Sequence, residues 1–163
     1  MFDDEMRAQA AALIARYRKK DLTLATAESC TGGLVAGLIT EIPGSSDVFE
    51  RGFVTYSNAA KVECLGVDPA LLDAFGAVSR EVAEAMAAGA LAFSSAEAAV
   101  SVTGIAGPGG GSAEKPVGLV YFACGRKAGE ITAVERRFGD IGRDAVRSAS
   151  VAMALKLLFE AAG

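Results

Sequence analysis

Apolar side chains recur at helical spacing in several segments of this 163-residue sequence. In residues 3–19 they fall on one face, with acids at the start of the segment and bases at its end, which complements a helix dipole. Comparable stripes are bounded by stop or capping residues such as Ile42-Pro43-Gly44 and Asp68-Pro69. The predicted helices cover residues 3–19, 34–42, 57–65, 68–76, 80–93 and 143–161.

Short apolar runs with β-branched residues predict five strands, at 22–24, 49–56, 97–103, 117–124 and 131–138. The run at 97–103 is apolar enough for a central strand, and the tight link 125–129 makes the last two strands an antiparallel hairpin. Early strands alternate with helices, so they should be parallel, and one late strand must be antiparallel. We therefore expect an α/β fold: a three-layer α/β/α arrangement with a mixed, mostly parallel five-stranded sheet.

Composition fits one domain over residues 1–163, because 52% of the residues are hydrophobic and no linker or repeat divides the chain. Abundant alanine and glycine suggest helices packed closely on the sheet. The net charge of −4 and the lack of a basic run beyond Arg18-Lys19-Lys20 argue against a nucleic-acid partner. Neither a signal peptide nor a membrane span is visible, so we expect a cytoplasmic protein.

Histidine is absent, which excludes Ser-His and Cys-His catalysis and histidine metal sites. The three cysteines, Cys30, Cys64 and Cys124, are far apart and form neither a disulfide framework nor a zinc spacing. We expect no metal and no cofactor. Any general base must be a lysine, tyrosine, aspartate, glutamate or backbone group.

The stretch from Ala25 to Gly33 joins the first strand to a helix through Ser29-Cys30-Thr31-Gly32-Gly33. Small hydroxyl side chains and free N–H groups at a helix N-terminus suit an anionic ligand. They equally suit a nucleophile with an oxyanion site beside it. Taken alone, Ser29 is also a common type of helix cap.

Three strand ends should meet at one edge of the sheet, where open α/β sheets bind ligands. The first supplies Ser29, the second Tyr56 and Lys61, and the third Thr103-Gly104. Without histidine, Lys61 is the best base for Ser29, provided that burial lowers its pKa from about 10.4 towards about 7–8. Tyr56 could relay a proton or orient the lysine.

Each of these residues also has a simpler interpretation. Lys61 could be a solvated helical lysine and Tyr56 an aromatic at the sheet rim. Cys30 is a rival nucleophile that lacks an obvious base. Glu28 should point to the other side of the strand from Ser29, and we interpret it as structural.

A glycine loop follows the third strand, at residues 104–111. It lacks the Walker lysine and the dinucleotide pattern, so it could be a mobile lid or a backbone cradle for a phosphate. Arg143 and Arg147 begin the last helix and could reach that phosphate, or they could lie on a solvated helix face.

Four separated segments resemble the CinA C-terminal domain family, which includes nicotinamide-nucleotide amidase. They are AESCTGG at 27–33, GFVTYSNAAK at 52–61, VTGIAGPGG at 102–110 and KPVG at 115–118. The resemblance covers nearly the whole chain. Longer members carry an additional N-terminal domain, for which this chain is too short, so it resembles the stand-alone form.

The resemblance implies that nicotinamide mononucleotide, a pyridine nucleotide, is hydrolysed to nicotinate mononucleotide and ammonia. Ser29 matches the family's nucleophile, Lys61 its base, Tyr56 a partner in the same site and Thr103 a residue at the third strand end. We expect the oxyanion donors near Thr31 to Gly33. The predicted substrate-binding residues are Thr31, Gly32, Gly33, Thr103, Gly104 and Arg143.

Two other functions remain open. The Tyr56 and Lys61 pair superficially resembles a Ser-Tyr-Lys dehydrogenase, but that spacing is usually one residue shorter and the first strand turn lacks the dinucleotide fingerprint. A catalytically silent nucleotide-binding or interaction module of the same fold is the stronger alternative. Alanine-rich helix faces would suit a homodimer, although nothing in the sequence specifies one.

Overall fold

The computed structural model describes residues 2–163. Its elements, in chain order, are α1 (Asp4–Lys19), β1 (Leu24–Glu28), α2 (Leu34–Glu41), the 3₁₀ turn η1 (Ser45–Asp47), β2 (Phe49–Val54), α3 (Asn58–Leu65), α4 (Pro69–Phe75), α5 (Arg80–Ala92), β3 (Ala98–Gly104), β4 (Leu119–Arg126), β5 (Ile131–Arg137) and α6 (Arg143–Ala161).

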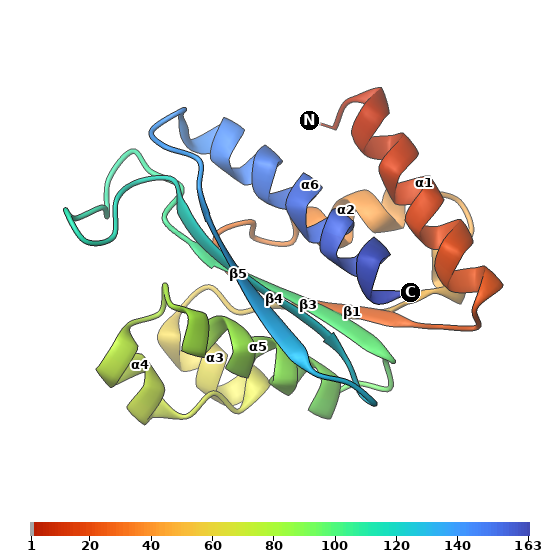
Figure 1. The fold of residues 1–163 in the computed structure, drawn as a ribbon, viewed down its shortest axis with the longest axis horizontal. Helices are drawn as coiled ribbons and strands as arrows, with labels where there is room; N and C mark the ends of the chain where they lie inside the picture. Colours follow the sequence, from red (N-terminus) through yellow and green to blue (C-terminus); the bar gives the residue numbers. More distant parts are fainter. Residues whose placement is uncertain (1) are drawn as a thin grey trace.

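The five strands form one mixed sheet in the order β2-β1-β3-β4-β5. β1 pairs in parallel with both β2 and β3, whereas β4 is antiparallel to β3 and to β5. Helices α1, α2 and α6 cover one face of the sheet, and α3, α4 and α5 cover the other (Figure 1). The predicted α/β/α fold with a mixed sheet and a terminal hairpin is therefore confirmed.

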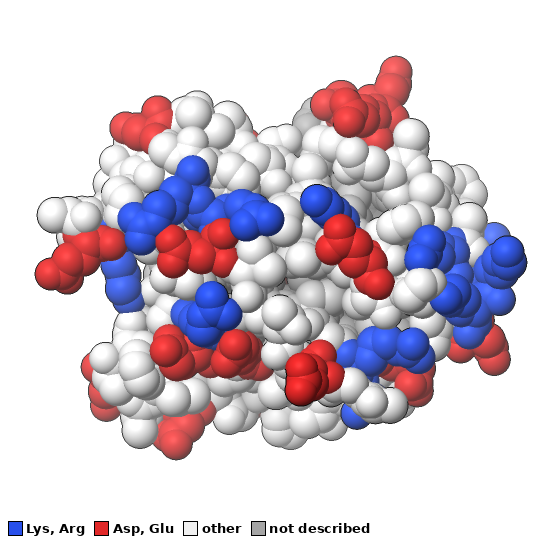
Figure 2. Space-filling model, viewed as in Figure 1, with Lys and Arg blue, Asp and Glu red and all other residues white. Residues whose placement is uncertain are grey.

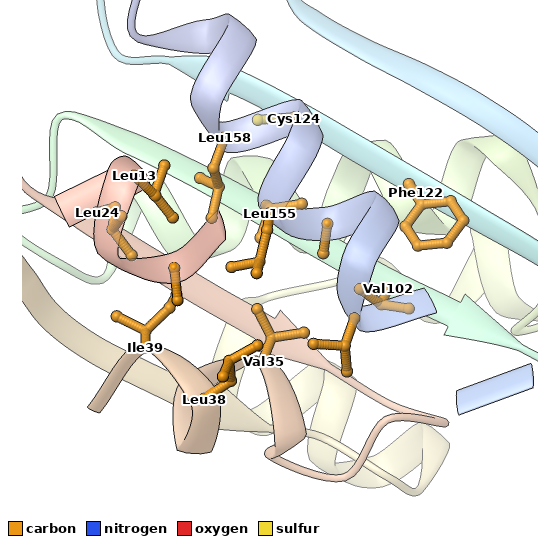
Figure 3. Close-up of a cluster of buried hydrophobic side chains, with 14 of the residues drawn as sticks. Leu13, Leu24, Val35, Leu38, Ile39, Val102, Phe122, Cys124, Leu155 and Leu158 are labelled. Atoms are coloured by element: carbon orange, nitrogen blue, oxygen red, sulfur yellow. The ribbon is translucent and has the colours of Figure 1, made fainter. Parts of the chain in front are cut away.

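The larger core lies between the sheet and the helices α1, α2 and α6. Leu155 and Leu158 of α6 pack with Leu13 of α1 and with Val102 and Phe122 of the sheet (Figure 3). Each of these side chains is almost fully buried, which stabilises the fold by roughly 1.5–3 kcal/mol per residue relative to exposure.

The opposite face is packed through small residues. Ala83 and Ala87 of α5 lie against Ala123 and Ala133 of the sheet. A Cβ at Gly89 would lie only 2.1 Å from the carbonyl oxygen of Leu65, so α5 approaches the end of α3 more closely than any side chain permits. The alanine and glycine content thus supports close packing, as predicted.

The first strand was predicted too early in the chain. It was expected at 22–24 but runs over Leu24–Glu28, and all its residues are buried. Ala25 and Ala27, on either side of the β-branched Thr26, have little strand propensity. They form an interior strand because β2 and β3 pair with β1 on both sides, and tertiary pairing overrides weak local preference.

The hairpin begins later than predicted as well. β4 starts at Leu119 because Gly118 takes a left-handed φ of 87° and packs directly against Gly139. A side chain at Gly118 would lie 2.2 Å from the Gly139 carbonyl, so the chain turns there before the strand begins.

Basic and acidic side chains are interspersed over the face shown in Figure 2, with no extended area of one sign. A group of basic side chains gathers at the C-terminal end of α1, where Arg16, Arg18 and Lys19 occupy the last turn. Within residues 2–163, no helix is both long and apolar enough to cross a membrane.

Candidate active site

Ser29 lies in the turn that joins β1 to α2. Its N–H donates to the carbonyl of Val102 at 2.9 Å, which extends the β1–β3 pairing by one residue. The chain then reverses through Gly32 and Gly33, whose φ angles of 61° and 95° favour glycine. Ser29 is 9% exposed, so its hydroxyl is held in a nearly closed site.

Lys61 reaches the same site from the first turns of α3. That helix begins after Ser57, whose side chain accepts from the N–H of Ala60. The Nζ atom of Lys61 lies 3.0 Å from Ser29 Oγ and 2.8 Å from the carbonyl oxygen of Thr55. The predicted pairing of Ser29 with Lys61 is thus present in the structure.

The Lys61 side chain is only 1% exposed and lies within 4.0 Å of no carboxylate in residues 2–163. Burial lowers the pKa of the Lys61 amine from its ordinary value of 10.5, because the charged form loses water that nothing anionic replaces. A lysine that acts as a general base needs a lowered pKa of this kind, because only the neutral amine accepts a proton.

Tyr56 contributes a different group from the one predicted. Its side chain is 61% exposed, and its phenolic oxygen accepts from Arg143 Nη2 at 3.2 Å. The backbone carbonyl of Tyr56, not the phenol, accepts from Lys61 Nζ at 3.3 Å. Because the strand end exposes consecutive carbonyls, Thr55 and Tyr56 both orient the amine through the main chain.

Ser29 and Lys61 open onto a cavity of about 280 Å³. Thr103 and Gly104 line it, as the convergence of strand ends predicted. The Thr103 hydroxyl donates to the Ala77 carbonyl at 2.7 Å, so it is already paired. The full lining is Ser29, Cys30, Tyr56, Lys61, Ala77, Val78, Thr103, Gly104, Ile105, Ala106, Gly107, Gly109, Gly110 and Arg143.

The charge of this lining comes from Arg143. Among residues 2–163 the lining contains no aspartate or glutamate, and its other basic residue is Lys61, whose pKa is lowered. Arg143 lies at the start of α6 and donates to the carbonyl of Gly107 at 2.8 Å, so it links the glycine loop to Tyr56 across the cavity. Such a cavity favours an anionic ligand.

The predicted oxyanion donors at Gly32 and Gly33 are wrong, because both N–H groups have other acceptors. Gly33 donates to the carboxylate of Glu28 at 3.0 Å and Gly32 to the Ser29 carbonyl at 3.0 Å. Neither glycine lines the cavity, nor does Thr31. The Glu28 carboxylate also accepts from Val35 and Ala36, so it caps α2 in place of an ordinary N-cap side chain.

Other backbone amides remain available at the cavity. In residues 2–163, the N–H groups of Cys30, Ala106 and Gly107 donate to no backbone carbonyl of another residue, and the Cys30 amide lies against its own thiol. Cys30 directly follows Ser29, which is the position from which strand–nucleophile–helix turns supply an oxyanion donor. That positional rule was the one signal in the sequence that could have indicated the Cys30 amide.

The thiol of Cys30 is not a competing nucleophile in this environment. Burial raises the pKa of Cys30 to about 11, so the thiolate that reacts is scarce at neutral pH. Within residues 2–163 no three histidine, cysteine, aspartate or glutamate side chains are grouped as a metal site would require.

Arg147, the second candidate for a phosphate, does not line the cavity. Its guanidinium donates to the carbonyls of Cys30 and Thr31 at 3.2 Å and 3.1 Å. Arg147 therefore contacts the Ser29 turn itself, from the side of α6.

Fold and site together define an α/β protein with a buried serine–lysine pair at the carboxyl ends of its parallel strands. The profile of the CinA family, described as "CinA C-terminal domain", matches residues 6–162. The chain belongs to the CinA C-terminal domain family.

Its relatives include "Nicotinamide-nucleotide amidohydrolase PncC" of Escherichia coli K12, which is 50% identical over 161 residues, 98% of this chain and 96% of that protein. The protein of the same name from Enterobacter agglomerans is 52% identical over 143 residues, which cover 87% of this chain and 86% of that relative. A "CinA-like protein" of Akkermansia muciniphila is 56% identical over 119 residues, but these make up only 29% of its length.

A solved structure shares the whole fold. The "competence/damage inducible protein CihA" of Agrobacterium tumefaciens superposes with a TM-score of 0.98 at 52% identity, covering 100% of this chain and 99% of that one. A CinA superfamily protein of E. coli superposes with a TM-score of 0.90 at 32% identity, over 98% of this chain and 93% of that one.

Proposed function

We propose that this protein is an amidohydrolase that converts nicotinamide mononucleotide and water to nicotinate mononucleotide and ammonia, through an acyl-enzyme on Ser29 with Lys61 as the base. The observation that carries the proposal is the 3.0 Å contact between Lys61 Nζ and Ser29 Oγ, both buried. The names of the two PncC relatives support the reaction class and the substrate.

The contacts of Lys61 suit a neutral amine. Neutral lysine has two N–H donors and one lone pair, and the carbonyls of Thr55 and Tyr56 provide two acceptors. With both N–H groups so engaged, the lone pair faces the Ser29 hydroxyl and can take its proton. General-base assistance of this kind contributes typically 10²–10⁴-fold.

The proposed reaction proceeds in two acyl-transfer steps. Ser29 Oγ bonds to the carboxamide carbon while its proton passes to Lys61 Nζ. The carbon–nitrogen bond then breaks, and the Lys61 ammonium returns that proton to the departing NH₂ group, which leaves as ammonia. Water attacks the resulting ester with Lys61 again as base, which releases the carboxylic acid and restores the Ser29 hydroxyl.

The carbonyl oxygen becomes negative in both steps, and the Cys30 N–H is the proposed donor to it. It follows the nucleophile directly, and in residues 2–163 it donates to no backbone carbonyl of another residue. One oxyanion donor is worth roughly 2.7–4 kcal/mol in comparable sites.

The cationic cavity supports a phosphate-bearing substrate. Arg143 lies at its mouth, and the free amides of the glycine loop, Ala106 and Gly107, lie in its wall. Backbone N–H groups in succession make anion-binding concavities. We propose that Arg143 and this loop hold the phosphate while Ser29 and Lys61 face the carboxamide.

The test is ammonia release from nicotinamide mononucleotide by the wild type, Ser29→Ala, Lys61→Ala and Lys127→Ala. Lys127 is the matched control, since its amine also donates to a backbone carbonyl, that of Ser94, away from the cavity. We expect losses of about 10²–10⁴-fold or more for the first two variants and wild-type rates for the third.

No ammonia from the wild type between about pH 6 and pH 10 would overturn the amidohydrolase proposal. If the nucleotide still bound, a silent binding module would be the correct function. Undiminished release by Ser29→Ala would leave an amidohydrolase but remove Ser29 as its nucleophile.

A further inference from the structure

The turn that carries Ser29 contains two successive glycines with positive φ angles. Gly32 and Gly33 follow each other in left-handed conformations, and α2 begins without a hydrogen bond from a capping side chain at Gly33. Glycine in such positions leaves the chain with more conformational freedom than any other residue. The position of Ser29 relative to Lys61 therefore depends on contacts from outside the turn.

One side of the turn is fixed by Glu28. Its fully buried carboxylate accepts from the N–H groups of Gly33, Val35 and Ala36 at 2.9–3.0 Å. In residues 2–163 no lysine or arginine lies within 4.0 Å of it. The helix N-terminus is then the compensating positive group.

The other side is fixed by Arg147 of α6. Its Nε and Nη2 atoms donate to two successive carbonyls, those of Cys30 and Thr31, which immediately follow the nucleophile. A Cβ added at Gly32 would lie 3.6 Å from Nη2, so the guanidinium lies along the turn. No carboxylate in residues 2–163 lies within 4.0 Å of Arg147 that would divert its charge.

Arg147 lies outside the reaction cavity. It lines a separate hollow with Phe2, Leu34 and Asp144. Its guanidinium donates to the carbonyls of the Ser29 turn, and Arg147 itself does not line the reaction cavity.

We infer that Arg147 is a positioning residue for the reaction, which with Glu28 clamps the 29–33 turn from both sides and sets the Ser29 Oγ to Lys61 Nζ distance. The inference rests on the proposed role of Ser29 as nucleophile. It separates the two arginines of α6: Arg143 faces the ligand, and Arg147 holds the nucleophile.

The experiment compares wild type, Arg147→Ala, Arg147→Lys and Arg80→Ala. Arg80 is the matched control, because its guanidinium also donates to a backbone carbonyl, that of Ala133, away from the cavity. The kcat and KM for ammonia release are measured together with the thermal midpoint. A second measurement is the rate at which a sulfonyl fluoride labels Ser29, which needs no assumption about the substrate.

A displacement of about 1 Å in a reacting group lowers rates by about 10²-fold. We therefore expect Arg147→Ala to lower kcat by about 10- to 100-fold, with KM within about threefold of wild type, and to slow labelling to a similar degree. Arg147→Lys should be intermediate, because an ammonium keeps the charge but does not span both carbonyls. Arg80→Ala should retain wild-type kcat and labelling.

Two results would overturn the inference. One is an Arg147→Ala variant with wild-type kcat and labelling rate. The other is a loss of activity that matches the unfolded fraction at the assay temperature. If the wild type released no ammonia, the proposed function would fail, and the labelling rates alone would then test the role of Arg147. Slower labelling in Arg147→Ala would support the clamp. Equal labelling in the two proteins, or no labelling of the wild type, would overturn it.

Discussion

The guanidinium of Arg143 donates both to the phenolic oxygen of Tyr56 and to the carbonyl of Gly107, and so spans the mouth of the cavity. The phenol is thereby directed towards Arg143, while the main chain of Tyr56 contacts Lys61. The side chain and the main chain of Tyr56 therefore have different partners, and a substitution of the side chain separates their effects.

Replacing Tyr56 by Phe should have a small effect on kcat. The substitution removes the exposed hydrogen bond to Arg143 but keeps the carbonyl that orients Lys61. A typical hydrogen bond contributes about 0.5–1.5 kcal/mol net, and this one is exposed, so we expect a loss of about tenfold or less in ammonia release. A loss as large as that of Ser29→Ala would show that the phenol itself moves a proton.

Replacing Arg143 by Ala should raise KM more than it lowers kcat. Arg143 is the exposed cation of the cavity lining, and a charge-assisted hydrogen bond contributes about 1.5–3 kcal/mol, or about 10- to 150-fold in affinity. The effect should vanish with the corresponding nucleoside, which lacks the phosphate. Arg136→Ala is the control, since within residues 2–163 the guanidinium of that exposed arginine donates only to the carbonyl of its neighbour Glu135 on β5. An equal effect on nucleotide and nucleoside would contradict the proposal that Arg143 binds the phosphate.

The kcat/KM of the wild type should rise with pH and level off below pH 10.5. Burial lowers the pKa of Lys61 from 10.5, and only the neutral amine accepts the Ser29 proton, so activity is lost as pH falls through the lowered pKa. The thiol of Cys30 does not account for this rise, because burial raises its pKa to about 11. A profile that falls with pH over the same range would contradict the lysine base.

Thiol reagents should modify Cys64 and leave the activity intact. Cys64 is exposed, whereas Cys30 and Cys124 are buried, and burial raises the pKa of Cys124 to about 12. A titration with a chromogenic disulfide should detect one thiol in the native protein and all three after denaturation. Cys30→Ala should retain activity within about threefold, because its contribution is a backbone N–H. Rapid inactivation that tracks modification of Cys30 would contradict this assignment.

Gly104→Ala should lower the free energy of unfolding by about 1–3 kcal/mol, as overpacking commonly does. Its Cβ would lie 2.7 Å from a Val120 methyl and 2.8 Å from the Leu119 carbonyl oxygen, so β3 and β4 would have to separate. Gly37→Ala is the control. Nothing lies within 4 Å of a Cβ there, and alanine in the interior of α2 should stabilise the protein by about 0.5–1 kcal/mol. Urea denaturation of both variants checks the opposite signs.

The sequence alone was sufficient for the outline of the site. Helical periodicity, capping residues and glycine stops are local features, so they predicted α3, α6 and the hairpin within a few residues. The absence of histidine restricted the base, and strand ends of a parallel sheet meet at one edge. Ser29 and Lys61 follow from these two arguments, although 32 positions separate them.

Only the tertiary structure decided which atoms meet at that edge. Every residue except proline carries the same backbone N–H and carbonyl, so the sequence does not show that the Gly33 amide binds Glu28 while the Cys30 amide donates to no carbonyl of another residue. The same holds for Arg147, whose carbonyl partner at Cys30 lies 117 positions away. The pKa of Lys61 depends likewise on burial under elements far along the chain, because desolvation is set by packing and not by sequence neighbours.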